Sequence, residues 1–149
     1  MAPAFETLDD FAALMRTVRG PDAAAQTGAA DRNGQLTKPP GALGRLEDLA
    51  IWYGAWRGMA RPVLVAPQIV IFAGNHGVAA RGVSAFPPEV TAQMVGNFQA
   101  GGAAINQLAR TFGARMQVAA LDLDRPTGDF TETEALGEAD CIAALRTGW

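Results

Sequence analysis

The segment from Val63 to Gly77 constrains the fold of this chain more than any other. Residues Val63–Phe72 form a nearly unbroken apolar run rich in β-branched side chains, which predicts a strand covered on both faces in a parallel sheet. The glycine-rich turn Gly74–Gly77 (GNHG) then ends the run. In open α/β sheets, small molecules bind at loops that leave the carboxyl ends of strands, so this turn is a candidate ligand site.

Composition and charge place the chain among globular proteins and exclude several kinds of partner. With 149 residues, 49% of them hydrophobic, it can bury one ordinary core. The net charge of −3 is spread without basic clusters, which argues against nucleic acid. No apolar run approaches the ~20 residues that cross a bilayer, and the first residues lack the order of a secretory signal. We therefore expect a cytoplasmic protein with no membrane partner, in which the single Cys141 is a buried, unreactive thiol.

Hydrophobic periodicity divides the chain into two parts. Apolar residues at helical spacing predict helices over residues 5–18, 22–32 and 41–56, and the second and third are joined by a rigid connector around Pro39-Pro40. After residue 60 the expected order is strand, helix, helix, strand and helix, over 63–73, 87–99, 103–112, 115–123 and 132–147. The sequence thus predicts an α/β fold with an N-terminal helical subdomain (1–60) followed by the first part of a parallel-sheet α/β substrate-binding domain (61–149).

Two predicted parallel strands do not make a stable sheet. Both would be edges, with unpaired N–H and C=O groups and partly uncovered apolar faces. The chain also stops at Trp149, directly after a predicted helix end. We therefore expect an α/β domain that is incomplete in this chain, as in a truncated gene product, a cut fragment or a partly traced chain.

The residues that carry chemistry leave several interpretations open. His76 is the only histidine, which excludes a metal site with several histidine ligands. Its side chain either contacts a ligand or holds the turn by a hydrogen bond to a backbone carbonyl. Asn75 has the same two interpretations. Asp122 and Asp124 alternate along the second strand, where they would hold a ligand or Mg²⁺ or else begin a solvated loop. Phe86 begins an apolar stripe that is most simply part of a core.

Three segments resemble the nicotinate-nucleotide:dimethylbenzimidazole phosphoribosyltransferases, which make the lower-ligand nucleotide of cobalamin. They are Leu36–Glu47 (LTKPPGALGRLE), Phe72–Val78 (FAGNHGV) and Gly82–Val95 (GVSAFPPEVTAQMV), and Gly101–Ile105 (GGAAI) extends the match. Their order and length make the resemblance specific, and it covers the whole chain.

The resemblance implies transfer of a phosphoribosyl group from nicotinate mononucleotide to dimethylbenzimidazole, which gives α-ribazole phosphate and nicotinate. It implies no cofactor and no metal, because the charged pyridinium is a good leaving group. A homodimer is also implied. The family's general base, a glutamate near its C-terminus, belongs to a half that this chain lacks, so the chain alone contributes no catalytic residue and is expected to be inactive. The alternative is a noncatalytic benzimidazole- or nucleotide-binding α/β module.

The resemblance also assigns binding residues. Phe86, Val90 and Met94 fall where the family builds its pocket for the flat base, and Gly74, Asn75 and His76 form the adjoining turn. Some relatives have serine in place of Phe86 and glutamine in place of Met94, so the preferred base stays open. The turn often has aspartate in place of Asn75, so its polar role stays open too.

Overall fold

A computed structural model of the chain describes residues 4–149, which fall into two compact units. One unit is Arg16–Val65, and the other joins Ala66–Trp149 to the described residues that precede Arg16. Helices and a parallel sheet together make the fold α/β, as the sequence predicts. No helix within residues 4–149 combines the length and the apolar character that crossing a bilayer requires.

The unit Arg16–Val65 is a pair of packed helices, α2 (Ala23–Gly34) and α3 (Arg45–Arg57). The side chain of Asp22 caps α2 by accepting a hydrogen bond from the Ala25 N–H at 2.8 Å. Small residues let the helices approach closely, since a Cβ added to Gly54 would lie 3.1 Å from the Ala29 Cβ and 2.9 Å from the Met59 carbonyl oxygen. Glycine at position 54 therefore sets the distance between α2 and α3.

The connector between α2 and α3 is held by one carboxylate. Glu47 accepts hydrogen bonds from Lys38 Nζ at 2.8 Å, Asn33 Nδ2 at 2.7 Å and the Leu43 N–H at 3.0 Å. The bond from Lys38, followed by that from Asn33, lowers the pKa of Glu47 from 4.5 to about 2. The Lys38 and Glu47 side chains are only 14% and 10% exposed, so this pair fixes a segment that prolines already stiffen.

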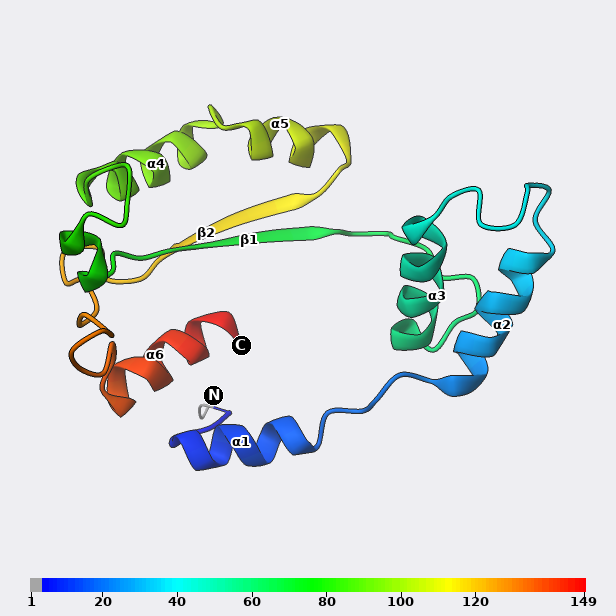
Figure 1. Ribbon diagram of the computed structural model, residues 1–149, viewed down its shortest axis with the longest axis horizontal. Coiled ribbons are helices and arrows are strands. Elements are labelled where there is room, and N and C mark those ends of the chain that lie inside the picture. The colour runs from blue at the N-terminus through cyan, green and yellow to red at the C-terminus, as the bar shows by residue number, and fades with distance from the viewer. Residues whose placement is uncertain (1–3) are drawn as a thin grey trace. The chain divides into compact units, whose positions relative to one another are not determined.

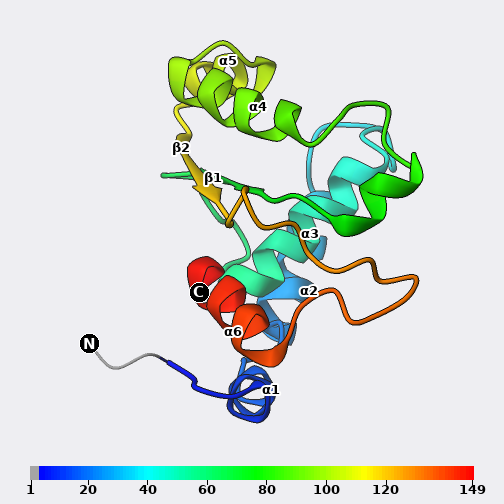
Figure 2. The same cartoon turned by 90° about the vertical axis from the view of Figure 1, so that its left-hand side faces the viewer.

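The second unit is built on two parallel strands, β1 (Gln68–Ala73) and β2 (Arg115–Ala120). Their register runs from Gln68 opposite Arg115 to Ala73 opposite Ala120. The crossover helices α4 (Glu89–Ala100) and α5 (Ala104–Thr111) lie on one face of the sheet, and α6 (Glu138–Gly148) lies on the other (Figures 1 and 2). A short 3₁₀ helix, η1 (Gly77–Arg81), follows β1. Because the strands are parallel and in this register, both end at the same edge of the sheet.

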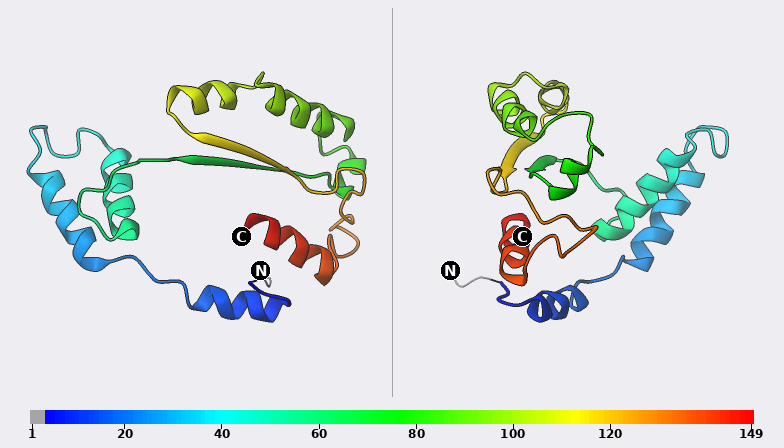
Figure 3. Two further views of the ribbon diagram at one scale, coloured as in Figure 1. Left: turned by 180° about the vertical axis from the view of Figure 1, so that it is seen from behind. Right: turned by 60° about the vertical axis from the view of Figure 1, so that its left-hand side comes forward.

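The first helix, α1 (Leu8–Arg16), packs along α6 (Figure 3). Phe5, only 2% exposed, lies with its ring 5.0 Å from that of Phe11 and 6.0 Å from that of Trp149. Arg146 of α6 donates to the Phe5 carbonyl oxygen at 2.9 Å. These contacts group α1 with the sheet rather than with α2 and α3, whereas the division into domains 1–60 and 61–149 stays a prediction.

Several predicted boundaries are too long. The predicted strand over 63–73 begins only at Gln68, because Pro67 has no N–H for a sheet ladder. The predicted strand over 115–123 ends at Ala120, since Asp122 adopts a left-handed φ of 41°. The predicted helix over 132–147 begins at Glu138, because the preceding residues form a loop closed by its own backbone bonds, from the Thr133 N–H to the Asp129 carbonyl oxygen and from the Gly128 N–H to the Ala135 carbonyl oxygen.

The expected cover on both faces of the first strand is incomplete in the described part of the chain. Ile69, Ile71 and Ala73 are half-buried on one side. On the other side, Val70 and Phe72 remain 45% and 48% exposed, although the Phe72 ring touches α6 near Gly148. An apolar run therefore predicts a strand correctly, while its surroundings are decided by which elements are present to pack on it.

Candidate functional site

The loops that follow β1 and β2 are joined by backbone hydrogen bonds. The Gly77 N–H donates to the Thr127 carbonyl oxygen, and the Thr127 N–H donates to the Asn75 carbonyl oxygen, both at 3.0 Å. Asn75 also donates through its side-chain Nδ2 to the Leu123 carbonyl oxygen at 2.8 Å. The turn predicted from GNHG is thus held on the neighbouring loop, and its tie is Asn75 rather than His76.

His76 has a different position. Its backbone pairs with Thr127, and its carbonyl oxygen accepts from the Ala79 N–H at 3.0 Å. Among the residues that the structure describes, none makes a hydrogen bond with the imidazole, which is exposed. Two cavities, one on each side of the turn, include His76 in their linings. The ring is therefore free to meet a ligand, and the first of these cavities is the one that the sequence predicts.

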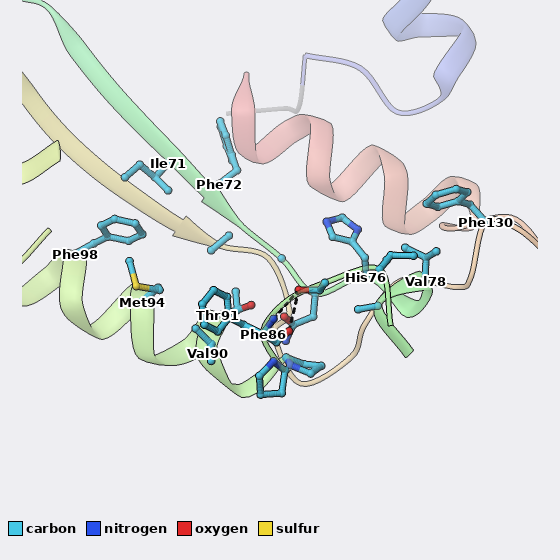
Figure 4. Close-up of a pocket in the computed structure, with 18 residues that line it drawn as sticks. Ile71, Phe72, His76, Val78, Phe86, Val90, Thr91, Met94, Phe98 and Phe130 are labelled. Atoms are coloured by element: carbon cyan, nitrogen blue, oxygen red, sulfur yellow. Dashed lines mark hydrogen bonds between the residues drawn. The ribbon is translucent and has the colours of Figure 1, made fainter. Parts of the chain in front are cut away.

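That cavity has a volume of about 650 Å³ and lies between the β1 loop and α4 (Figure 4). Its lining is largely apolar, with polar side chains only at Asn75, His76, Ser84 and Thr91. No carboxylate lines it within the described residues. An apolar cleft with few polar groups suits a flat, weakly polar heterocycle better than a charged ligand.

The three predicted pocket residues all line this cavity. Phe86 precedes α4 and is 69% exposed, and Met94 on the helix is 38% exposed, so neither is sealed in a core. Val90, half-buried, lies between them (Figure 4). The Ser84 hydroxyl donates to the Phe86 carbonyl oxygen at 2.9 Å, which fixes the turn that carries the Phe86 ring. The apolar stripe therefore faces an open cleft, rather than a core as its pattern most simply suggests.

The structure adds residues that the sequence did not assign. Phe98 continues the spacing of Val90 and Met94 by one more turn and reaches the cavity beside Ile71; this periodic signal was available in the sequence. Phe130 reaches the same cavity from the loop after β2. No local pattern marks Phe130, because only the pairing of the two loops brings it there.

The first carboxylate of the acidic pair after β2 is paired with an arginine. The left-handed backbone at Asp122 separates it from the strand, and its carboxylate accepts from Arg125 Nε at 2.9 Å. Arg125 also donates to Asp140 of α6 at 3.0 Å. The bond to Asp122, followed by that to Asp140, holds the pKa of the Arg125 guanidinium above its usual value. No group of three or more His, Cys, Asp or Glu side chains suited to a cation occurs within residues 4–149.

Comparisons with known proteins show the family of the chain. The family model described as Phosphoribosyltransferase (DBI_PRT) matches residues 18–149. Nicotinate-nucleotide–dimethylbenzimidazole phosphoribosyltransferases from Ruegeria sp. (strain TM1040) and Ruegeria pomeroyi are 65% and 66% identical over 149 residues, which is 100% of this chain and 44% of each relative. The chain thus spans less than half the length of these curated relatives.

Solved structures show the same fold. A crystal structure of the corresponding phosphoribosyltransferase from Thermus thermophilus superimposes with a TM-score of 0.74 at 37% identity, covering 85% of this chain and 43% of that one. A second, of CobT from the same organism, gives a TM-score of 0.71 at 37% identity over 84% of this chain and 42% of that one. The chain belongs to the nicotinate-nucleotide–dimethylbenzimidazole phosphoribosyltransferase family.

Proposed function

We propose that this chain forms the base-binding side of an enzyme that transfers phosphoribosyl from nicotinate mononucleotide to dimethylbenzimidazole. The observation that carries the proposal is the open apolar cavity in which Phe86, Val90 and Met94 lie together beside the end of β1. A planar two-ring base buries both faces in such a cleft, and burial of aromatic surface supplies its affinity. The Gly74–Gly77 turn forms the adjoining wall through Gly74, Asn75 and His76.

The proposed reaction forms one bond and breaks another. A benzimidazole nitrogen attacks C1′ of the phosphoribosyl group, the bond from C1′ to the pyridinium nitrogen breaks, and its electron pair stays on the nitrogen of the departing nicotinate. The N–H proton of the benzimidazole must pass to a base. Since no carboxylate lines the cavity within the described residues, we assign the chain the tasks of binding and orienting the base, and we assign the proton transfer to a group outside it.

Binding and turnover are tested separately. Calorimetric titration of the folded chain with dimethylbenzimidazole should give saturable binding, and Phe86→Ala should weaken it about 3- to 10-fold through loss of an aromatic contact. Phe112→Ala is the matched control, because Phe112 is 72% exposed and lies outside the cavity. A folded chain without saturable binding would contradict the proposal.

Turnover should need the rest of the enzyme. The 149-residue chain, incubated with nicotinate mononucleotide and dimethylbenzimidazole, should release no nicotinate in a chromatographic assay. A chimera that adds the unmatched part of the Ruegeria sp. TM1040 relative should release it. Sustained release by the chain alone would contradict its assignment as the noncatalytic side, whereas binding with an inactive chimera would favour a noncatalytic base-binding module.

We also propose that the enzyme is a homodimer and that α3 contributes to the contact. Leu46, Leu49, Trp52 and Trp56 form an exposed apolar stripe on this helix, with Trp52 57% and Trp56 47% exposed. Large exposed aromatic residues are frequent anchors of protein interfaces. Light scattering should report a dimer that Trp52→Ser weakens, and a monomer at every concentration would contradict this assignment. The cytoplasmic setting stays a prediction from the sequence.

A further inference from the structure

The loop after β2 is fastened to η1 by a single arginine. Arg81 donates from Nε to Asp129 and from its terminal nitrogen to Glu132. The Asp129 carboxylate also accepts hydrogen bonds from the Thr131 N–H at 2.9 Å and the Thr131 hydroxyl at 2.6 Å. Arg81, followed by Thr131, lowers the pKa of Asp129 to about 2. The Asp129 carboxylate is therefore charged at neutral pH. We call the cluster of Arg81, Asp129, Thr131 and Glu132 the clasp.

Phe130 lies between two residues of this clasp in the sequence. Its two sequence neighbours, Asp129 and Thr131, are the clasp residues, so the backbone on both sides of Phe130 is held. The ring lies near Val78 and His76, at the end of the cavity opposite Phe98 (Figure 4). The Phe130 side chain is 65% exposed. An exposed ring on a held backbone presents a fixed apolar wall at low entropic cost.

The cavity is larger than a two-ring base, so Phe130 can contact such a ligand from the side opposite α4. Its volume of about 650 Å³ lies within the range of sites for drug-sized ligands, and a two-ring base is smaller than these. The α4 residues lie at one end of the cavity (Figure 4), so a base bound against them needs a further surface at the other, outer end. Phe130 is the large aromatic residue at that position among the residues described.

We propose that Phe130 contacts the flat aromatic ligand as the outer wall of the cavity, and that Arg81 is a positioning residue that acts through Phe130. This inference rests on the proposed function of the cavity as a base site. It assigns a ligand contact to the β2 loop, and it gives the ion pairs on the surface of that loop a role in affinity.

Calorimetry of the full 149-residue chain with dimethylbenzimidazole tests the assignment. Phe130→Ala should raise the dissociation constant about 3- to 10-fold, while the exposed Phe112→Ala control should leave it unchanged. Arg81→Ala should raise it by no more than Phe130→Ala, and Arg81→Lys should restore part of the loss. The double variant should bind as Phe130→Ala does, because Arg81 acts only through the ring.

The outcomes separate this inference from the function on which it rests. If the wild-type chain binds and Phe130→Ala binds equally well, the wall assignment is wrong and the base site stands. If the losses from the two single variants multiply in the double variant, Arg81 does not act through Phe130. If the folded wild-type chain does not bind, the base site and the wall both fall. In that case, hydrogen exchange of the 127–136 amides without ligand tests whether Arg81 holds the loop. Unchanged exchange rates in Arg81→Ala would show that it does not.

Discussion

Gly77→Ala should force the β1 loop away from the β2 loop and open the site. A Cβ at position 77 would lie 2.5 Å from the Thr127 carbonyl oxygen, 2.9 Å from the Asp129 nitrogen and 2.9 Å from the Gly128 carbonyl carbon. All three atoms are backbone atoms, which no side-chain rotation can move aside. The two loops themselves must therefore separate.

The magnitude follows from these distances. The closest approach falls about 0.9 Å short of the 3.4 Å at which ordinary contact begins. A displacement of that size stretches the bond from the Gly77 N–H to Thr127, now 3.0 Å, beyond hydrogen-bonding range. Loss of one such bond costs about 1 kcal/mol, and overpacking strain adds about 1–3 kcal/mol. We expect the free energy of unfolding to fall by about 2–4 kcal/mol.

Gly74→Ala in the same turn provides a matched control. A Cβ at position 74 would meet only the Leu121 carbonyl oxygen, at an ordinary 3.9 Å, so this variant should stay within about 0.5 kcal/mol of the wild type. Urea unfolding followed by circular dichroism measures both variants, and dimethylbenzimidazole titration should show lost affinity in Gly77→Ala. Equal stability of the two variants would refute the close approach of the loops and, with it, the reasoning about the site.

Three further changes test other parts of the structure. Asn75→Ala should lower the free energy of unfolding by about 1 kcal/mol through loss of the bond to Leu123; an unchanged urea midpoint would show that the side chain does not tie the loops. Gly96→Ala should stabilise α4 by up to about 1 kcal/mol, because its Cβ would enter open space, and a lower thermal midpoint would contradict the position of this helix face. Glu47, with its pKa lowered from 4.5 to about 2, should contribute stability that is fully present above pH 4.5 and is lost as the pH falls through about 2. Lys38→Ala should move the Glu47 pKa, measured by carboxyl NMR titration, back toward 4.5, and a wild-type value already near the ordinary one would rule out this hold on the connector.

Much of the fold and part of the site could be predicted from local patterns. The apolar run before the GNHG turn indicated β1, and proline at positions 87 and 88 marked the start of α4, because both signals act within a few residues. The stripe of Phe86, Val90 and Met94 marked one wall of the cavity for the same reason. Phe98 lies one helical turn beyond Met94 on the same period, so the local pattern extends to it as well.

The sequence by itself determined the order of the elements, the α/β class and the family, since periodicity, turn residues and three long motifs are local properties of the chain. The tertiary structure decided which residues of the two loops lie in contact. It made Asn75 the tie between the loops and left His76 free, and it brought Phe130 to the cavity. These outcomes depend on contacts between residues about fifty positions apart, which form only when β1 and β2 pair and bring the two loops together.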